Sequence, residues 1–390
     1  MIIERFRKHL PLSPSVNPPF SSLSDSSLSD PREWRLTNGR YALISLPSVA
    51  LTPHRFSLAR RILTMLSDYC YQGLIPTGFA EHDGKPMYDS IDTSLWWIET
   101  LGLYLEASQD WSFLQEQYAV VNQIYKAFTA GTLHSIHVDA SDGLLTWSDR
   151  TMALTWMDAT VDGTPVTPRC GKPIEVNALW YSSLCWASEW AERLSQQAPD
   201  PRVLSNQARR YGQQAEQVKQ SLQRFWNGDA SYLFDAISPD DRCDPAIRPN
   251  AVLALALQHC AFAPEQARRV LQIARDRLLT PYGLRSLDPA HPTYIGHYDG
   301  MPQSAHQGTV WSWLLDSFLR AWYRSCSDLP LGFDLQPLAT HVENKVCLHT
   351  ISEAFDGEPP HTPRGATATG GAIAELLRAD GRIKGITIVG

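Results

Sequence analysis

Apolar residues recur every three or four positions along most of the chain, and this spacing constrains the fold more than any other feature. It is clearest in the segment 202–226, whose apolar side chains are Leu204, Ala208, Tyr211, Ala215, Val218, Leu222 and Phe225. Side chains at this spacing share one face of an α-helix, which buries that face. Similar patterns occur in 58–69, 95–105, 305–324 and 366–379, and Pro264 is typical of a first helical turn. We predict about eleven or twelve helices and few strands.

Short and long loops alternate between these predicted helices. The long loops are rich in Gly, Pro, Trp, Asp and His, and they span 73–91, 134–176, 228–247, 280–304 and 348–365. Long loops inside a compact domain are usually functional. The pattern therefore favours an all-α helical toroid in which one rim carries the site. A helical solenoid is the competing architecture, but no sequence repeat is visible to support it.

The first thirty residues differ in composition from the rest of the chain. Residues 11–30 contain eight serines and four prolines, which offer little to a packed core. We predict a flexible leader over 1–33 and a single domain over 34–390, because no charge run or Pro/Gly-rich linker divides the latter segment.

Charge and cysteine content exclude several classes of function and of site. The net charge is −7, which gives no support to nucleic-acid binding or to a polybasic membrane surface. Seven cysteines occur without a C-x-x-C pair, so neither a zinc site nor a disulfide framework is indicated. The N-terminal apolar stretch is too short for a secretory signal, and no later run is long enough to span a membrane. We expect a cytoplasmic protein without a metal or organic cofactor, and its oligomeric state is left open.

Trp156 and Asp158 lie in a turn, and the glycines and prolines of 163–173 exclude regular structure until a helix begins near Asn177. An aromatic ring beside a carboxylic acid suits sugar chemistry. The ring packs on a pyranose face, and an apolar wall raises the pKa of the acid, which then holds a proton near neutral pH. A buried tryptophan next to a helix-capping aspartate is the alternative, which these residues alone favour.

Several loop motifs follow one another in a fixed order. They are Gly39-Arg40 before Ile44-Ser45-Leu46-Pro47, then Gly73-Leu74-Ile75-Pro76, Tyr88-Asp89-Ser90-Ile91-Asp92 before Leu95-Trp96-Trp97, Thr155-Trp156-Met157-Asp158, Gly171-Lys172-Pro173-Ile174-Glu175, Ile247-Arg248-Pro249-Asn250, Tyr282-Gly283-Leu284-Arg285, His306-Gln307-Gly308-Thr309-Val310-Trp311, and Ile351-Ser352-Glu353-Ala354-Phe355-Asp356-Gly357 before Pro363-Arg364-Gly365.

This ordered set resembles the glucosidase domain of glycogen debranching enzymes, the amylo-α-1,6-glucosidase family, over residues 39–380. The resemblance implies an (α/α)6 toroid that hydrolyses α-1,6-linked glucose with inversion. It also implies that Asp158 is the general acid and Glu353 the general base. An inverting glycosidase holds its two carboxyl groups roughly 6.5–9.5 Å apart, which leaves room for one water. The loop of Glu353 is polar, which suits an ionised carboxylate.

The resemblance further implies a set of sugar-contacting residues, namely Arg40, Trp156, Glu175, Arg248, His306, Gln307, Trp311 and Arg364. Alternatives stay open for most of them. The three arginines are equally consistent with buried structural roles. His306 and Gln307 are expected at the start of a helix, where they either cap it or bind glucose. Glu175 and Asp92 lie at predicted helix starts, where the helix dipole alone explains an acid.

The chain departs from the family pattern at several positions, among them Ala305, where the family usually has Tyr. Asn38 and Tyr41 stand where the family usually has Trp and Asp, and Thr369–Gly371 replaces its usual Q-A-W. The leading hypothesis is an exo-acting α-glucosidase that acts on branch stubs of a glycogen-like glucan. The second is a catalytically weak or inactive carbohydrate-binding or regulatory protein. A third, sugar epimerisation or lyase chemistry, needs a histidine base, for which only His306 is a natural candidate.

Overall fold

The computed structural model describes residues 38–51, 54–80, 82–334, 336–344 and 351–367. The predicted leader over 1–33, the departure at Thr369–Gly371 and all but the first two residues of the predicted helix over 366–379 lie outside these ranges. No helix in the described part of the chain has both the length and the apolar content to cross a membrane.

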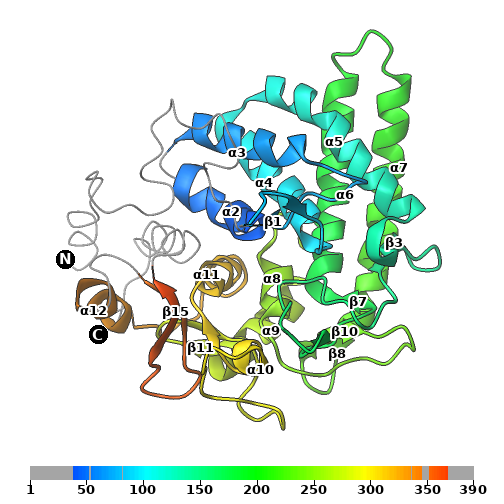
Figure 1. Ribbon diagram of the computed structural model, residues 1–390. Helices are drawn as coiled ribbons and strands as arrows, with labels where there is room; N and C mark the ends of the chain where they lie inside the picture. Colours follow the sequence, from blue (N-terminus) through cyan, green and yellow to red (C-terminus); the bar gives the residue numbers. More distant parts are fainter. Residues whose placement is uncertain (1–37, 52–53, 81, 335, 345–350, 368–390) are drawn as a thin grey trace.

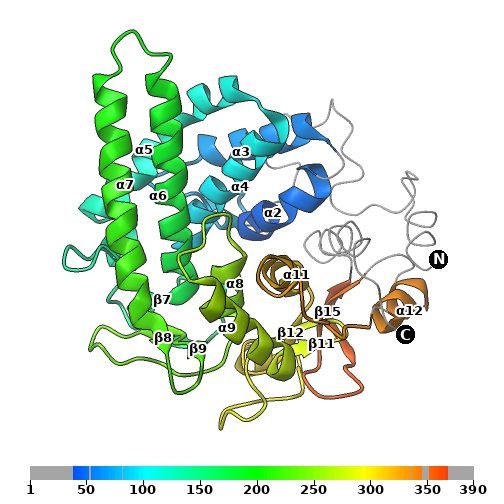
Figure 2. The same ribbon diagram turned by 180° about the vertical axis from the view of Figure 1, so that it is seen from behind.

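Helices dominate the described residues, and they occur at most of the places that the apolar spacing indicates (Figure 1). Their bounds are α2 Gly39–Leu46, α3 Phe56–Asp68, α4 Asp92–Ser108, α5 Trp111–Ala130, α6 Ile174–Ser195, α7 Arg202–Leu222, α8 Asn250–Ala256, α9 Pro264–Arg277, α10 Pro302–Ala305, α11 Leu314–Ser325 and α12 Gln336–Asn344. Shorter turns of π- or 3-10 helix are η2 Pro47–Leu51, η3 Leu133–Ser135 and η4 Gln223–Phe225. The two long helices α6 and α7 lie side by side at one edge of the molecule (Figures 1 and 2).

Short strands occupy the loops between the helices. Hairpins pair β1 Gly78–Phe79 with β2 Pro86–Met87, β3 His137–Val138 with β4 Leu145–Thr146, β5 Thr160–Val161 with β6 Thr164–Pro165, and β8 Trp226–Asn227 with β9 Tyr232–Leu233. β7 Lys172–Pro173 pairs with β10 Ala236–Ile237. A five-stranded antiparallel sheet runs in the order β11 Leu279–Thr280, β12 Gly283–Arg285, β13 Val310–Trp311, β14 Ser352–Phe355 and β15 Pro363–Thr367.

This sheet is an addition to the predicted helical fold. The long elements are helical as predicted, but the C-terminal part of the described chain adds the sheet, and β15 covers the start of the helix predicted from residue 366. Strands of two to five residues are too short to display an alternating pattern. The sheet was therefore invisible to sequence periodicity.

The centre of the helical part depends on a close contact between α4 and α6. Gly102 faces Trp186, and a Cβ atom at this glycine would lie 2.3 Å from the indole Cε2. Nearby, the buried carboxylate of Glu99 accepts hydrogen bonds from Ser182 Oγ at 2.6 Å, Trp186 Nε1 at 3.0 Å and the backbone N–H of Gln258 at 2.8 Å. One acid thus joins α4, α6 and the end of α8 in the core.

The predicted helix over 305–324 is wrong over residues 306–313. α10 ends at Ala305, β13 follows at Val310, and α11 begins only at Leu314. Gly308 adopts φ +138°, where a Cβ atom would lie 2.5 Å from the carbonyl oxygen of Ile295. Because the chain must pass this carbonyl so closely, His306 and Gln307 stand in an irregular segment between α10 and β13 and not at the start of a helix.

Candidate active site

The loop 155–158 is anchored to the core by its own buried side chains, above all Trp156. Trp156 is 2% exposed, and its indole N–H donates to Asn250 Oδ1 at 2.7 Å. Trp313, His306 and Trp311 pack edge-on against the indole, with ring centroids 5.2, 5.2 and 6.5 Å away. The predicted stacking of a sugar on Trp156 is therefore not supported, because its ring is enclosed by other aromatic groups.

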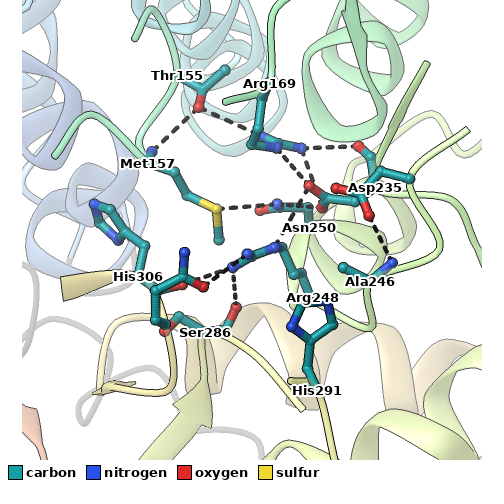
Figure 3. Close-up of polar contacts among 12 residues, drawn as sticks. Thr155, Met157, Arg169, Asp235, Ala246, Arg248, Asn250, Ser286, His291 and His306 are labelled. Atoms are coloured by element: carbon teal, nitrogen blue, oxygen red, sulfur yellow. Dashed lines mark hydrogen bonds and ion pairs between the residues drawn. The ribbon is translucent and has the colours of Figure 1, made fainter. Parts of the chain in front are cut away.

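A buried charge network lies under this loop (Figure 3). Arg169 donates from Nε to Asp235 Oδ2 at 2.7 Å, from Nη2 to Glu175 Oε2 at 2.6 Å and from Nη1 to Glu175 Oε1. The same guanidinium reaches Thr155 Oγ1 at 3.3 Å, and Asp235 Oδ1 accepts from Asn250 Nδ2 at 2.7 Å. The network thus connects the residues that anchor Trp156 to two ion pairs.

Glu175 belongs to this network and does not face a sugar. It is 1% exposed, and both of its carboxylate oxygens accept from Arg169. Burial raises the pKa of Glu175, although the charge of Arg169 lowers it in part. Of the interpretations open for Glu175, these contacts favour the structural one: the acid at the start of α6 neutralises a buried arginine.

Arg248 is also buried, and it holds the segment between α10 and β13. Its Nη1 donates to the carbonyl oxygens of Ser286 at 3.1 Å and His306 at 2.7 Å, and its Nη2 donates to Gln307 Oε1 at 3.1 Å. Burial lowers the pKa of Arg248. The carboxylate of Asp235 raises this pKa only in part, because it lies 3.9 Å away. Of the two readings left open for Arg248, these contacts favour the structural one.

Asp158 stands at the end of the loop, and its side chain is 52% exposed. Arg40, from the first turn of α2, donates from Nη1 to Asp158 Oδ2 at 3.1 Å, and His306 Nε2 lies 3.8 Å from Oδ1. Burial raises the pKa of this carboxyl, but His306 and the charge of Arg40 lower it more, and the net pKa lies below the ordinary value. The raised pKa expected from an apolar Trp156 wall is wrong, because Arg40 arrives from a distant segment.

Glu353 lies on β14, and its carboxyl group is in a less polar environment than the polar residues around it in the sequence had predicted. Burial raises the pKa of the Glu353 carboxyl, and the backbone N–H of Ala366, 3.1 Å from Oε2, lowers it in part. The backbone carbonyl of Glu353 accepts from Ser312 Oγ at 3.0 Å, which ties β14 to the residue after β13. Without sugar, the two acids thus have pKa shifts opposite to those expected from the sequence.

Tyr41 lies near both of these carboxylates. Burial raises the pKa of its phenol first, and the negative charges of Asp158 and Glu353 raise it further. The ring packs edge-on against Trp313, with centroids 6.0 Å apart. Arg40, next to Tyr41, binds Asp158, and Ser312, next to Trp313, binds the backbone of Glu353, so the segments of the two acids meet at the Tyr41–Trp313 pair although 195 residues separate Asp158 and Glu353.

The remaining predicted residues lie around this region. Trp311 is 7% exposed on β13, and its ring stacks on that of His306 with centroids 5.8 Å apart. Gln307 is held by Arg248, as described above. Arg364, on β15, donates from Nε to Asp356 Oδ1 and from Nη2 to Asp356 Oδ2, each at 3.0 Å, so that its guanidinium is already occupied by an acid.

Several residues of the site were not identified from the sequence: Arg169, Asp235, Trp313 and Tyr298. Asp92 was named only as an acid at a predicted helix start. Asp235 had a usable signal, because a charged residue inside the apolar run 232–237 predicts a buried partner. Tyr298 had no such signal, because it stands in a long loop. Its ring nevertheless lies 6.4 Å from that of Trp311, and its pKa is raised first by burial and then by the charge of Glu353.

Two carboxyl groups that face one region, surrounded by aromatic rings and an arginine, can perform general acid–base catalysis on a neutral polar substrate. Among the described residues, histidine, cysteine, aspartate and glutamate form no group of three or more that could hold a metal ion.

Comparison with known proteins agrees with the predicted family. The family model described as amylo-alpha-1,6-glucosidase matches residues 25–378. The glycogen debranching enzyme of Saccharomyces cerevisiae is 24% identical over a stretch that covers 73% of this chain and 24% of that enzyme's own length. The chain thus corresponds to a minor part of its curated relative.

Solved structures of similar fold are known. GH63 mannosylglycerate hydrolase from Thermus thermophilus, in complex with glucose, superimposes with a TM-score of 0.60 at 12% identity, covering 87% of this chain and 91% of that chain. A rhamnosidase from Klebsiella oxytoca with rhamnose bound gives a TM-score of 0.50 at 16% identity, covering 89% and 58%. At these identities the likeness concerns the fold alone. Because the family model matches nearly the whole sequence, the chain belongs to the amylo-alpha-1,6-glucosidase family, a family of glycoside hydrolases.

Proposed function

We propose that the protein is an inverting, exo-acting α-glucosidase, built on an (α/α)6 toroid, that removes α-1,6-linked glucose from branch stubs of a glycogen-like glucan in the cytoplasm. The observation that carries the proposal is the meeting of the two acidic segments at one aromatic pair. Arg40 donates to Asp158 at 3.1 Å, its neighbour Tyr41 packs against Trp313 with centroids 6.0 Å apart, and Ser312, the neighbour of Trp313, donates to the backbone carbonyl of Glu353 at 3.0 Å. Two carboxyl groups around one space are what an inverting glycosidase requires.

Asp158 acts as the general acid and Glu353 as the general base. Asp158 donates a proton to the glycosidic oxygen as the bond to the anomeric carbon breaks, and Glu353 takes a proton from the water that attacks the opposite face. In the free protein His306 and Arg40 hold the pKa of Asp158 below its ordinary value, so the acid must gain its proton after the sugar has entered. A bound sugar favours this change, because it excludes water and competes for Arg40.

The polar groups around Asp158 suit a neutral sugar. Arg40 and His306 offer N–H groups beside the acid, and His306 Nδ1 is buried without a hydrogen-bond partner among the described residues. The T. thermophilus mannosylglycerate hydrolase, which has a similar fold, was solved with glucose bound, and this supports a glucose-sized site in such a fold.

The test is glucose release from a branched limit dextrin, with the anomer of the first product followed by NMR. We expect β-glucose from the wild-type protein, because inversion at an α linkage gives the β anomer, and no release from Asp158→Asn. Release of α-glucose would refute inversion. Release by Asp158→Asn at the wild-type rate would refute the assignment of the acid.

A non-catalytic sugar-binding protein is the second candidate, favoured by the phenol of Tyr41 where relatives usually carry an acid. Calorimetric titration with glucose and isomaltose separates the two. Binding without any turnover would favour this second function, whereas turnover would exclude it.

A further inference from the structure

Asp92, the first residue of α4, is fully buried beside Arg40. Its Oδ1 accepts from Arg40 Nε at 2.9 Å and from Ser90 Oγ at 2.5 Å. Its Oδ2 is buried too, but it has no hydrogen-bond partner within the described part of the chain. A buried carboxylate oxygen without a partner is costly. A second state of the site in which this oxygen is satisfied would therefore relieve that cost.

A small movement of Arg40 would produce such a state. Its guanidinium is shared between two acids, with Nε on Asp92 and Nη1 on Asp158 at 3.1 Å. Guanidinium and carboxylate pair best when two parallel N–H groups bind the two oxygens. A small turn that brings Nε and Nη2 onto both oxygens of Asp92 would satisfy Oδ2, and it would draw Nη1 away from Asp158.

We propose that Asp92 is a positioning residue that shares Arg40 with Asp158 in the free protein and takes Arg40 over through Oδ2 when a glucoside occupies the site. The inference rests on the proposed function, because it explains how the acid becomes protonated. Once Nη1 has left, Asp158 takes up one proton from solvent. It passes this proton to the leaving oxygen as the glycosidic bond breaks, while Glu353 accepts a proton from the attacking water.

Other groups around Asp158 do not provide the same switch. Tyr41 from α2 is a neutral phenol, and Glu353 from β14 carries no positive charge. His306 before β13 also lowers the pKa of Asp158, but burial lowers the pKa of His306 itself, so it is not a lasting positive charge at neutral pH. Arg248 lies beyond His306 and is fixed by three hydrogen bonds. Arg40 is therefore the cation whose movement releases Asp158.

The experiment follows the Asp158 carboxyl by NMR in protein labelled with 13Cγ-aspartate, with its resonance assigned from Asp158→Asn. In the free protein, Asp92→Asn should lower the pKa of Asp158, because Arg40 is then no longer shared with a second negative charge. Arg40→Met should raise it. Adding glucose should raise the pKa of Asp158 in the wild-type protein but not in Asp92→Asn. Asp288→Asn, which removes another buried, arginine-paired acid, is the matched control and should leave that pKa unchanged.

Kinetics supply the second readout. For Asp92→Asn, kcat/KM on an α-1,6 glucoside at neutral pH should fall about tenfold for each unit by which the acid's pKa falls. Activity on α-glucosyl fluoride, whose leaving group needs little protonation, should be spared. Equal losses on both substrates, or the same glucose-induced rise in wild type and Asp92→Asn, would overturn the proposal. If Asp92→Asn fails to fold, an unchanged Asp158 pKa in Arg40→Met overturns it. A wild-type protein without turnover would refute the proposed function, and the free-state titrations would still decide the role of Asp92.

Discussion

Arg169→Met is the substitution that most severely tests the buried network under the Trp156 loop. Arg169 and its partners Glu175 and Asp235 have side chains that are only 2%, 2% and 1% exposed. Methionine keeps much of the length and the apolar stem of the arginine, but it leaves Glu175 without a cation, Asp235 with only Arg248 at 3.9 Å, and Thr155 Oγ1 without one of its donors.

The expected loss of unfolding free energy is about 3–5 kcal/mol, the typical cost of removing one partner of a buried ion pair. This is a large share of the roughly 5–15 kcal/mol that stabilises an ordinary domain. The loss should depend on pH. Without Arg169 the folded-state pKa of Glu175, already raised by burial, rises further above its unfolded value, so that protonation at acidic pH compensates in part and the loss grows as pH increases.

Urea unfolding followed by tryptophan fluorescence measures the effect at pH 5 and pH 8. The triple variant Arg169→Met, Glu175→Gln, Asp235→Asn removes the charges together and should recover part of the loss. The control Arg268→Met breaks an exposed pair with Asp328 and should unfold like wild type. A loss in Arg169→Met no greater than in this control, or one that shrinks as pH increases, would refute the reasoning.

Single contacts yield three more expected outcomes. Gly102→Ala should destabilise the protein by about 1–3 kcal/mol through overpacking, whereas Gly212→Ala, whose Cβ would lie 3.3 Å from Ser188 Oγ, should be tolerated in thermal unfolding. Burial raises the pKa of Asp110, but hydrogen bonds from Ser112, Tyr104 and Arg60 lower it to about 2. The stability that this carboxylate contributes is present above its unfolded pKa and is lost as pH falls through the folded value. Asp110→Asn should therefore make the unfolding free energy less dependent on pH between about pH 4 and pH 2. Tyr41→Phe should weaken glucose binding in calorimetry by about 0.5–1.5 kcal/mol without changing the melting temperature, and an unchanged affinity would mean that the phenol does not touch the sugar.

The helices could be predicted because their signals are local. The apolar stripe of 202–226 yields α7, and the proline at the start of α9 stands where its fixed φ and missing N–H are harmless. The sheet β11–β15 could not be predicted in this way, because strands two to five residues long carry no measurable alternation. The break at Gly308 was also hidden, since it depends on the carbonyl of Ile295 in another part of the loop.

The site was predictable in its composition but not in its electrostatics. The loop motifs identify the family and name Asp158 and Glu353 as candidates. The lowered pKa of Asp158 depends on His306 and on Arg40, which stands 118 residues earlier in the chain, and the partner of Glu175 is an arginine that no motif contains. Charge pairing between distant segments has no periodic signature, so these relations become visible only once the fold is known.

The central claim, that Asp158 is the acid and Glu353 the base, is tested most directly by comparing Asp158→Asn and Glu353→Gln on two substrates. One is an α-1,6-linked glucoside, which needs protonation of its leaving group, and the other is α-glucosyl fluoride, which needs little. We predict that Asp158→Asn loses turnover of the glucoside but keeps that of the fluoride, and that Glu353→Gln loses both. The opposite pattern, with the fluoride spared only in Glu353→Gln, would assign the acid to Glu353, in line with its raised pKa in the free protein, and would contradict the account.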